Sequence, residues 1–330
     1  MNKHEKEIEK TLLNNEKDML KQLQNTYIKA LADVKARVRL LKAREETQSV
    51  IYQINYQEAL EKQINGILEV LNQDNITNVS DFLNKMYSDG YIGLQYELMQ
   101  QGIPVVTVIN QDEIAKSLFQ KTAEMTFAER LGVNMTEFKT KIKEEITRGI
   151  ATGSTYQQIA QQLSLVTGEN LNKSYRIART EGHRVTAEAK LVSSQKAKDQ
   201  GADVVNQWDA TLDGKTRKNH RKLDGQWVEV GGYFEVNGRK VKAPGKFGRP
   251  EEDINCRCIL LTRPRWAVEG KRVKSAKITN EYGKEVEKLI EVNNYEDYKK
   301  GYYKLVNEDP EIEEVVRKAN ERIKEMRGGK

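Results

Sequence analysis

Two cysteines and one histidine are the residues of this sequence whose types and spacing best suit metal binding. Cys256 and Cys258 flank a single residue, and His220 precedes them in the same turn-rich stretch. Two thiolates and one imidazole are three of the four ligands that a tetrahedral zinc site needs. The three residues are therefore candidate ligands of a structural zinc ion. The candidates for its fourth ligand are His183, Asp209 and Asp224.

The small size of the surrounding module is the physical reason to expect such a centre. Fewer than 60 residues lie between Val204 and Leu261, and units of this size with many turns bury little apolar surface, so they usually need a cross-link. A disulfide between cysteines separated by one residue has poor geometry and is disfavoured in a reducing cytoplasm. Cys-x-Cys is not the usual Cys-x-x-Cys knuckle, however. The alternative remains that both are simple thiols and that His220 belongs to a hydrogen-bonded polar cluster.

The same histidine also lies among charged residues that a nuclease could use. His220 would be a general base, with Arg217 as a phosphate clamp and Asp209 as a nearby carboxylate. The sequence has no glycine-rich phosphate loop, no G-x-S-x-G motif and no H-E-x-x-H motif. We therefore expect a protein without catalytic residues. A nucleic-acid-processing enzyme of a mobile element is the alternative.

A series of motif residues extends from about residue 171 to residue 262. They are Arg179, Glu181, Trp208, Asp209, Arg217, His220, Leu223, Gly225, Pro244, Asn255, Cys256, Arg257 and Cys258. In this order and spacing these residues resemble the phage minor head proteins, the head-morphogenesis family related to the F protein of phage Mu and the portal-associated minor protein of phage SPP1. Residues 100–170 resemble the helical part that precedes this module in such proteins.

This resemblance implies a structural protein of the phage head. It implies a low-copy component needed for procapsid assembly, with the portal protein and the capsid or scaffold proteins as partners. It also implies a place in the virion, at the portal vertex or in the capsid interior, after synthesis in the bacterial cytoplasm. Packaging with the DNA and ejection with it would be consistent with that place.

Composition and charge favour an elongated, helix-rich protein over a compact enzyme. Charged residues make up 32% of the 330 residues and hydrophobic residues only 38%, so there is little core per residue. The net charge of +6 is spread along the chain, which predicts weak, sequence-independent DNA binding at most. A capsid-internal DNA-binding protein is a third hypothesis. No apolar run is long enough for a membrane span, so we expect no membrane partner.

Long helices are predicted for the first half of the chain, because no proline precedes Pro104. An apolar stripe from Ile8 to Leu41 predicts a long amphipathic helix, paired as a hairpin or a coiled coil. Because one chain need not cover this stripe, we expect packing on a partner or on a second copy, as a homo-oligomer.

A second helix should end at Asn72–Asn75, and others should cover 80–102, 127–150, 155–164 and 171–198. Two capping boxes, Thr126 with Glu129 and Ser154 with Gln157, mark helix starts, and the run Val105–Ile109 predicts a short strand or an extended crossing.

The later part of the chain predicts a small strand-rich module followed by a charged helical tail. Strands are expected at 204–208, 226–230, 233–236 and 256–261, with turns at the Asp-Gly and Asn-Gly pairs. The fold class is therefore α+β. The expected domains are 1–103 for the long helices, 104–170 for a helical connection, 171–262 for the head-morphogenesis module and 263–330 for the tail.

Overall fold

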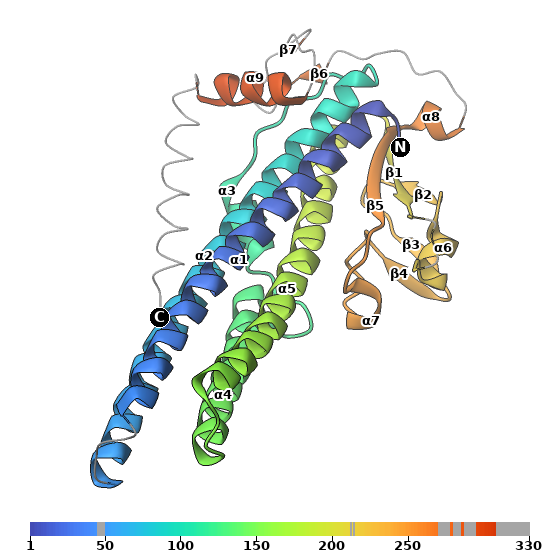
Figure 1. Ribbon diagram of the computed structural model, residues 1–330. Coiled ribbons are helices and arrows are strands. Elements are labelled where there is room, and N and C mark those ends of the chain that lie inside the picture. The colour runs from blue at the N-terminus through green and yellow to red at the C-terminus, as the bar shows by residue number, and fades with distance from the viewer. Residues whose placement is uncertain are drawn as a thin grey trace. The chain divides into compact units, whose positions relative to one another are not determined.

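The computed structural model describes residues 1–44, 50–211, 213, 215–269, 278–279, 285–286 and 295–307. Two compact units are assembled from separate stretches of the chain (Figure 1). One, here called the helical unit, consists of residues 16–82 and 124–179, and the other, the strand-containing unit, consists of residues 1–15, 83–123 and 180–330. Each unit thus combines stretches that lie far apart in the sequence, and the four consecutive domains expected from the sequence remain a prediction. Three long helices, α1 (Lys3–Arg44), α2 (Val50–Gln100) and α5 (Tyr156–Asp199), each contribute to both units.

The long helices continue through positions where the sequence predicted breaks. α2 passes through Asn72–Asn75 and through Ser80, which was expected to cap a separate helix. Asn75 is buried and its side-chain amide donates to the Tyr27 hydroxyl at 3.1 Å, so a tertiary contact engages the amide of a residue that otherwise favours turns. α5 likewise joins the two helices expected at 155–164 and 171–198.

Side-chain caps define where the shorter helices begin. α4 (Phe127–Ala151) starts at the predicted capping box, in which Thr126 and Glu129 bond each other's backbone amides. The second box lies one residue later than predicted, because Thr155 and Gln158 make the reciprocal bonds in place of Ser154 and Gln157. α3 (Gln111–Leu118) begins at Asn110, whose side chain accepts from the amide of Asp112.

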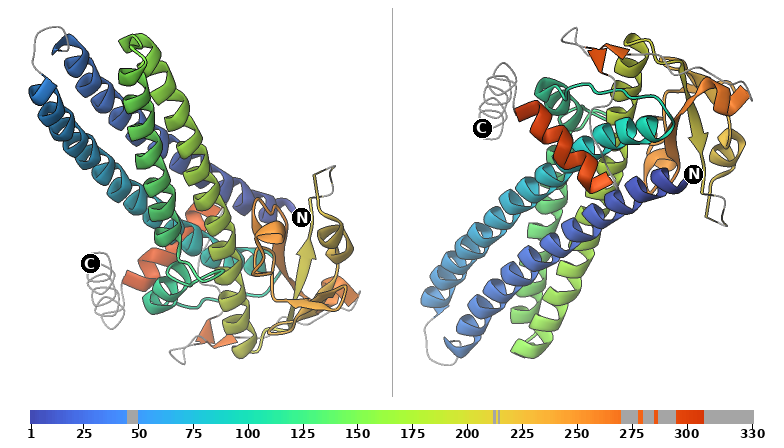
Figure 2. Two further views of the ribbon diagram at one scale, coloured as in Figure 1. Left: turned by 90° about the horizontal axis from the view of Figure 1, so that it is seen from below. Right: turned by 90° about the horizontal axis from the view of Figure 1, so that it is seen from above.

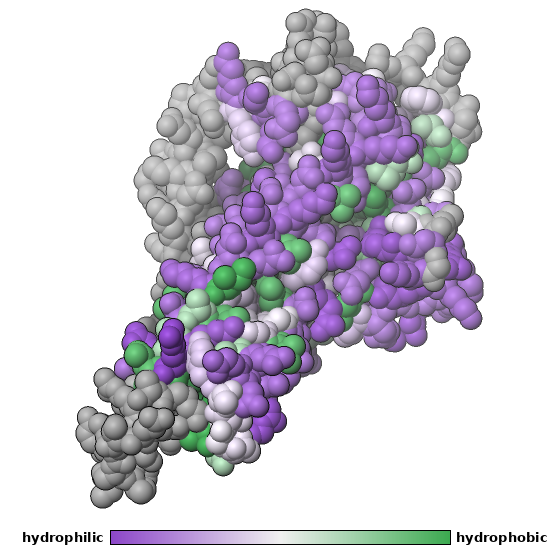
Figure 3. Space-filling view, viewed as in Figure 1, coloured by the Kyte–Doolittle hydropathy of each residue, from purple (hydrophilic) through white to green (hydrophobic). Residues whose placement is uncertain are grey.

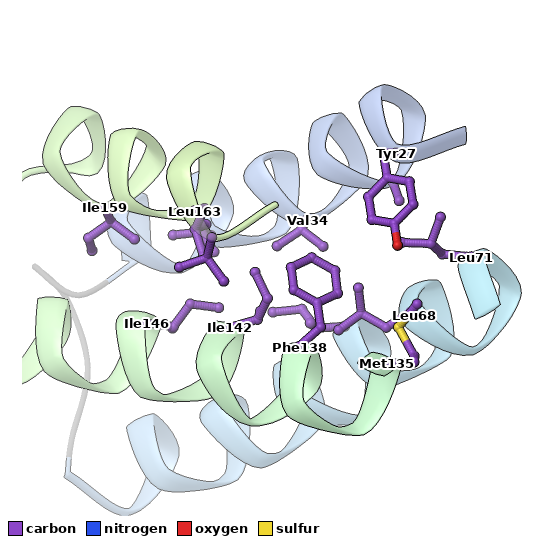
Figure 4. Packing of buried hydrophobic residues seen from close by; sticks show 14 of the residues in the cluster. Tyr27, Val34, Leu68, Leu71, Met135, Phe138, Ile142, Ile146, Ile159 and Leu163 are labelled. Atoms are coloured by element: carbon purple, nitrogen blue, oxygen red, sulfur yellow. The ribbon is translucent and has the colours of Figure 1, made fainter. Parts of the chain in front are cut away.

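Four helices form the core of the helical unit. Side chains from α1, α2, α4 and α5 meet there, among them Tyr27, Leu68, Phe138 and Leu163 (Figure 4). The α1 stripe is therefore covered by the chain's own helices: Met19, Leu23, Tyr27, Val34 and Val38 are each at most 1% exposed. This burial removes the reason for expecting a second copy to cover the stripe.

A three-stranded antiparallel sheet organises the strand-containing unit. Its order is β2 (Trp227–Glu229), β1 (Val204–Asp209) and β5 (Ile259–Pro264), and α6 (Lys218–Leu223) connects β1 to β2. A hairpin follows, with β3 (Phe234–Val236) and β4 (Arg239–Val241) joined at the predicted Asn237-Gly238 turn, where both residues have positive φ. The sequence predictions missed β4. They also placed the cysteines in a strand, whereas both lie in the loop between α7 (Pro250–Asp253) and β5.

The β-branched run before α3 is an irregular segment and not a strand. Its backbone pairs with a side chain: Gln95 donates to the Thr107 carbonyl at 3.1 Å and accepts from the Thr107 amide at 3.0 Å. This exchange replaces the strand partner that the run lacks. Of the two expectations for this run, a short strand or an extended crossing, the structure agrees with the crossing.

Part of the predicted C-terminal tail packs on the same unit. α9 (Tyr295–Asn307) lies beside the end of α2 (Figure 2), where the Tyr302 hydroxyl accepts from the Ile109 amide and Lys299 pairs with Asp89. The short elements α8 (Arg265–Glu269), β6 (Ile278–Thr279) and β7 (Glu285–Val286) precede it. The rest of the expected tail lies outside the described residues.

One face of the described chain is mainly polar. Figure 3 shows hydrophilic side chains over most of one face, with apolar residues in small groups along the helices. Among the described helices, none has the length and apolar character that crossing a membrane requires. Together these elements give the α+β fold that the sequence predicted.

Candidate metal centre

Helix α6 and the loop before β5 bring the predicted metal ligands together in the strand-containing unit. His220 lies on α6, and the two cysteines lie in the loop before β5. His220 Nδ1 is 3.2 Å from the sulfur of Cys258 and 3.5 Å from that of Cys256. The ligand atoms of the three residues all lie within 4.8 Å of one another, so the three could hold one metal ion.

The centre is enclosed by the core of its unit. His220 is 1% exposed, Cys256 6% and Cys258 2%. Both cysteines belong to an apolar cluster that includes Trp208 and Phe234. A polar group buried in such a place needs partners, and the three residues supply them to one another.

The pKa values of the two thiols shift in opposite directions. A hydrogen bond with the Cys258 thiol, together with burial, raises the pKa of Cys256 to about 12. The same bond lowers the pKa of Cys258, because it stabilises the Cys258 thiolate. The pair therefore loses its two protons in separate steps, and thiolates are the form that binds metals.

Aromatic rings hold the imidazole in a fixed plane. Phe247 stacks on His220 with ring centroids 5.3 Å apart, and Trp208 meets it edge-on at 5.8 Å. On the side away from the sulfurs, His220 Nε2 is 3.1 Å from a carboxylate oxygen of Glu252. The ring is thus oriented by contacts on its faces, on its edge and at Nε2.

The three candidates for a fourth ligand make other contacts. His183 Nε2 donates to the backbone oxygen of Cys258 at 2.7 Å, and the backbone of Gly245 covers the other nitrogen so closely that a Cβ there would lie 2.5 Å from it. Asp224 accepts from the Ala210 amide at 2.8 Å. Asp209 ends β1 opposite Ile259, and burial raises its pKa. None of the three joins the group formed by His220, Cys256 and Cys258.

Several charged residues of the motif set stabilise the loops around the centre. Arg257, between the two cysteines, makes two bonds to the carboxylate of Asp213 at 2.6 and 2.7 Å. Arg217 donates to the backbone oxygen of Ile254. Arg257 therefore links the cysteine loop to the segment before α6. Arg217, at the start of α6, links the helix to the same loop.

The motif residues on α5 lie elsewhere. Glu181 is buried and pairs with Arg184 at 2.7 Å. Arg179 belongs to the helical unit, where it pairs with Glu16 at 3.1 Å. Neither residue contributes a ligand atom to the centre.

Backbone conformation and packing explain the uncharged motif residues. Gly225 has φ of +75° and its amide donates to the Trp208 carbonyl at 2.9 Å, which closes the turn between α6 and β2. Asn255 has φ of +55°, a conformation that asparagine tolerates better than most residues, and it directs the chain into the cysteine loop. Leu223 and Pro244 are buried.

The sequence predictions missed Glu252, the carboxylate that contacts His220. It lies in the acidic run Glu251-Glu252-Asp253, whose members have equal status in the sequence. Only the first turn of α7 distinguishes them: Glu251 is exposed, whereas Glu252 and Asp253 are each 6% exposed. The sequence offered no signal that would select Glu252.

The geometry suits metal binding better than catalysis by His220. A general base must reach its substrate, but His220 is almost fully enclosed and both of its nitrogens have partners within the protein. Arg217 is engaged with the Ile254 carbonyl. The cluster expected for a nuclease is therefore not an open site.

Comparisons with known proteins give one family model and two relatives with different names. Residues 140–261 match the family model described as Phage Mu protein F like protein. The chain is 29% identical over 265 residues to the NAD(+)--arginine ADP-ribosyltransferase EFV of Enterococcus faecalis, and the aligned region is 79% of this chain but 54% of that protein. It thus spans about half the length of that relative. This chain is also 28% identical over 269 residues to minor head protein GP7 of Bacillus phage SPP1. That alignment covers 78% of this chain and 86% of the phage protein. No solved structure matches.

Proposed function

We propose that this chain is a minor head protein similar to the phage Mu F-like family and works as a structural component of a phage head. The alignment with the SPP1 minor head protein, which covers 86% of that protein, carries the proposal. The family model covers the module that contains His220, Cys256 and Cys258. The expected resemblance to phage minor head proteins is thereby confirmed.

A non-enzymatic role is supported by how the two relatives overlap. The aligned regions cover 79% and 78% of this chain, so they must share more than half of it. The alignment of this chain with the minor head protein extends over 86% of that protein. In contrast, nearly half of the transferase lies outside its alignment with this chain. We therefore assign the shared part to head assembly rather than to ADP-ribosyl transfer.

The partners follow from this assignment. The chain meets the portal protein or another capsid or scaffold protein, and its place is the virion, at the portal vertex or in the capsid interior. The polar face in Figure 3 and the burial of the helical stripe favour a folded protein that docks through surface side chains.

Assembly of procapsids tests the role. Procapsids made with the portal should contain the chain at a low, fixed copy number, and procapsids made without the portal should contain less of it if the portal is its partner. A chain that never co-sediments with procapsids would contradict the proposal.

Incubation with NAD⁺ and agmatine tests the rival activity, and formation of ADP-ribosylagmatine would overturn the non-enzymatic role.

We further propose that His220, Cys256 and Cys258 bind zinc as a structural ion. The donor set is the one that zinc prefers, and the site lies in a module with a small core, where the metal's binding energy would stabilise the fold. Protein purified without a histidine tag should contain about one zinc per chain by elemental analysis. Cys258→Ser should release the zinc and unfold the module.

A matched variant separates metal loss from ordinary core damage. Val236→Ala removes apolar volume from the same cluster without touching a ligand atom, so it should lower stability and leave the zinc bound. If the thiols bind no metal, Cys258→Ser should cost only ~1 kcal/mol and leave the module folded. A folded wild-type protein without zinc would refute the metal proposal.

A further inference from the structure

We infer that Glu252 is the positioning residue of the metal centre, and that it makes Nδ1 of His220 the nitrogen that binds the ion. This inference rests on the proposed zinc site. It concerns a residue outside the ligand set, which the sequence did not single out. Three observations carry it: the contact at Nε2, the support behind the carboxylate and the spacing of the ligand atoms.

The contact with Glu252 fixes which nitrogen carries the proton. An ionised carboxylate only accepts hydrogen bonds, so the group 3.1 Å from Glu252 Oε2 must be an Nε2–H. A neutral imidazole with its proton on Nε2 has its lone pair on Nδ1. Nδ1 is the atom that faces the two sulfurs. Glu252 therefore selects the tautomer that presents a lone pair to the metal position.

The carboxylate itself is held in place. Asn219, the neighbour of His220 on α6, donates its side-chain amide to the other oxygen of Glu252 at 2.6 Å. Asn219 in turn accepts from Asn237 at the tip of the β3–β4 hairpin, at 2.8 Å. Glu252 is 6% exposed, so both of its oxygens are committed within the protein and solvent does not compete strongly for them.

The spacing of the ligand atoms is that of an ion-binding set. Zn–S bonds of about 2.3 Å and Zn–N bonds of about 2.0–2.1 Å at the tetrahedral angle place nitrogen and sulfur about 3.6 Å apart. His220 Nδ1 lies 3.2 and 3.5 Å from the sulfurs. An ion therefore fits between these atoms with shifts of a few tenths of an ångström. A carboxylate, a histidine and a metal in series form a common arrangement in zinc proteins, in which the carboxylate raises the basicity of the ligating nitrogen.

Nuclear magnetic resonance identifies the ligating nitrogen directly. The chain has three histidines, so His4→Gln and His183→Gln variants suffice to assign the ring signals of His220. With NMR-active cadmium in place of zinc, scalar coupling should join the metal to Nδ1, and Nε2 should carry the proton. Coupling to Nε2 would overturn the inference.

Metal affinity tests the role of Glu252. Competition with a chromophoric chelator should show zinc binding roughly 10–100-fold weaker in Glu252→Ala than in wild type. Glu252→Gln should be intermediate, because its amide oxygen still accepts the bond but carries no charge. Glu251→Ala is the matched control: Glu251 belongs to the same short helix but is exposed and pairs with Arg249, so affinity should not change.

The possible failures are distinguishable. A wild-type protein that binds no zinc refutes the proposed metal site. A wild-type protein that binds zinc, together with a Glu252→Ala variant that binds it equally tightly, refutes only the role of Glu252. Should Glu252→Ala not fold, the NMR measurement on the wild-type fold still decides which nitrogen binds the metal.

Discussion

Glu97 on α2 and Lys190 on α5 form an ion pair that is almost completely withdrawn from solvent. The Lys190 ammonium lies 3.5 Å from Glu97 Oε1, and the side chains are 4% and 1% exposed, respectively. Burial raises the pKa of Glu97, and the charge of Lys190 opposes that rise. Each charge is therefore tolerated in the core mainly because of the other.

Removing one member of this pair should cost far more than removing both. Lys190→Met should destabilise the protein by about 3–5 kcal/mol, because it leaves a carboxylate buried without its partner. The double variant Glu97→Met with Lys190→Met should recover most of that loss, since no charge remains. Urea denaturation of the three proteins measures the difference.

An exposed pair supplies the comparison. Lys143 and Glu61 are 61% and 44% exposed, and Lys143→Met should change the free energy of unfolding by less than about 1 kcal/mol. A double variant at Glu97 and Lys190 as unstable as Lys190→Met alone would contradict the account of the buried pair.

Tyr27 should give the helical unit a stability that declines in alkali. Its hydroxyl donates to Asn170 at 2.6 Å and contacts Ser174 and Asn75, and burial raises its pKa to about 12. The unfolded value is about 10, so the folded state keeps the proton longer. Its contribution is fully present below pH 10 and is lost as the pH rises through 12.

Tyr27→Phe isolates this effect. At neutral pH the variant should be about 1–3 kcal/mol less stable, because Asn170 and its neighbours lose a buried partner. Between pH 10 and pH 12 the gap from wild type should narrow. Denaturation followed by circular dichroism at several pH values measures it, and a gap that stays constant to pH 12 would argue against the raised pKa.

Two glycines of α4 should respond oppositely to the same substitution. A Cβ at Gly149 would lie 2.5 Å from Cγ1 of Ile159 on α5, whereas a Cβ at Gly132 would have no such atom within 4 Å. Gly132→Ala should stabilise by about 0.5–1 kcal/mol through helix propensity. Gly149→Ala should destabilise by about 1 kcal/mol or more, because the clash outweighs that gain. Thermal unfolding of both variants decides, and a stabilised Gly149→Ala would show that α4 and α5 are not packed this closely.

DNA binding should be weak and sensitive to salt. The net charge is +6 over 330 residues, and residues 204–260 contain eleven basic against eight acidic residues. Fluorescence anisotropy with two unrelated duplexes should give equal affinities that fall steeply as salt rises. Selective binding to one duplex at physiological salt would support the capsid-internal DNA-binding hypothesis instead.

The sequence alone determined the elements whose causes are local. The apolar period of α1, the Thr126 capping box and the Asn237-Gly238 turn were predictable because each depends on residues within a few positions of one another. The motif residues also indicated the resemblance to phage minor head proteins, and the two cysteines with His220 were identified as candidate metal ligands.

Tertiary structure decided what depends on residues far apart in the chain. α2 continues through Asn75 because Tyr27, forty-eight residues earlier, accepts its hydrogen bond. Glu252 differs from Glu251 only because α7 turns it toward His220, thirty-two residues away. Local propensities are weak, a few tenths of a kcal/mol per residue, so burial and buried hydrogen bonds outweigh them, and those contacts exist only once the chain has folded.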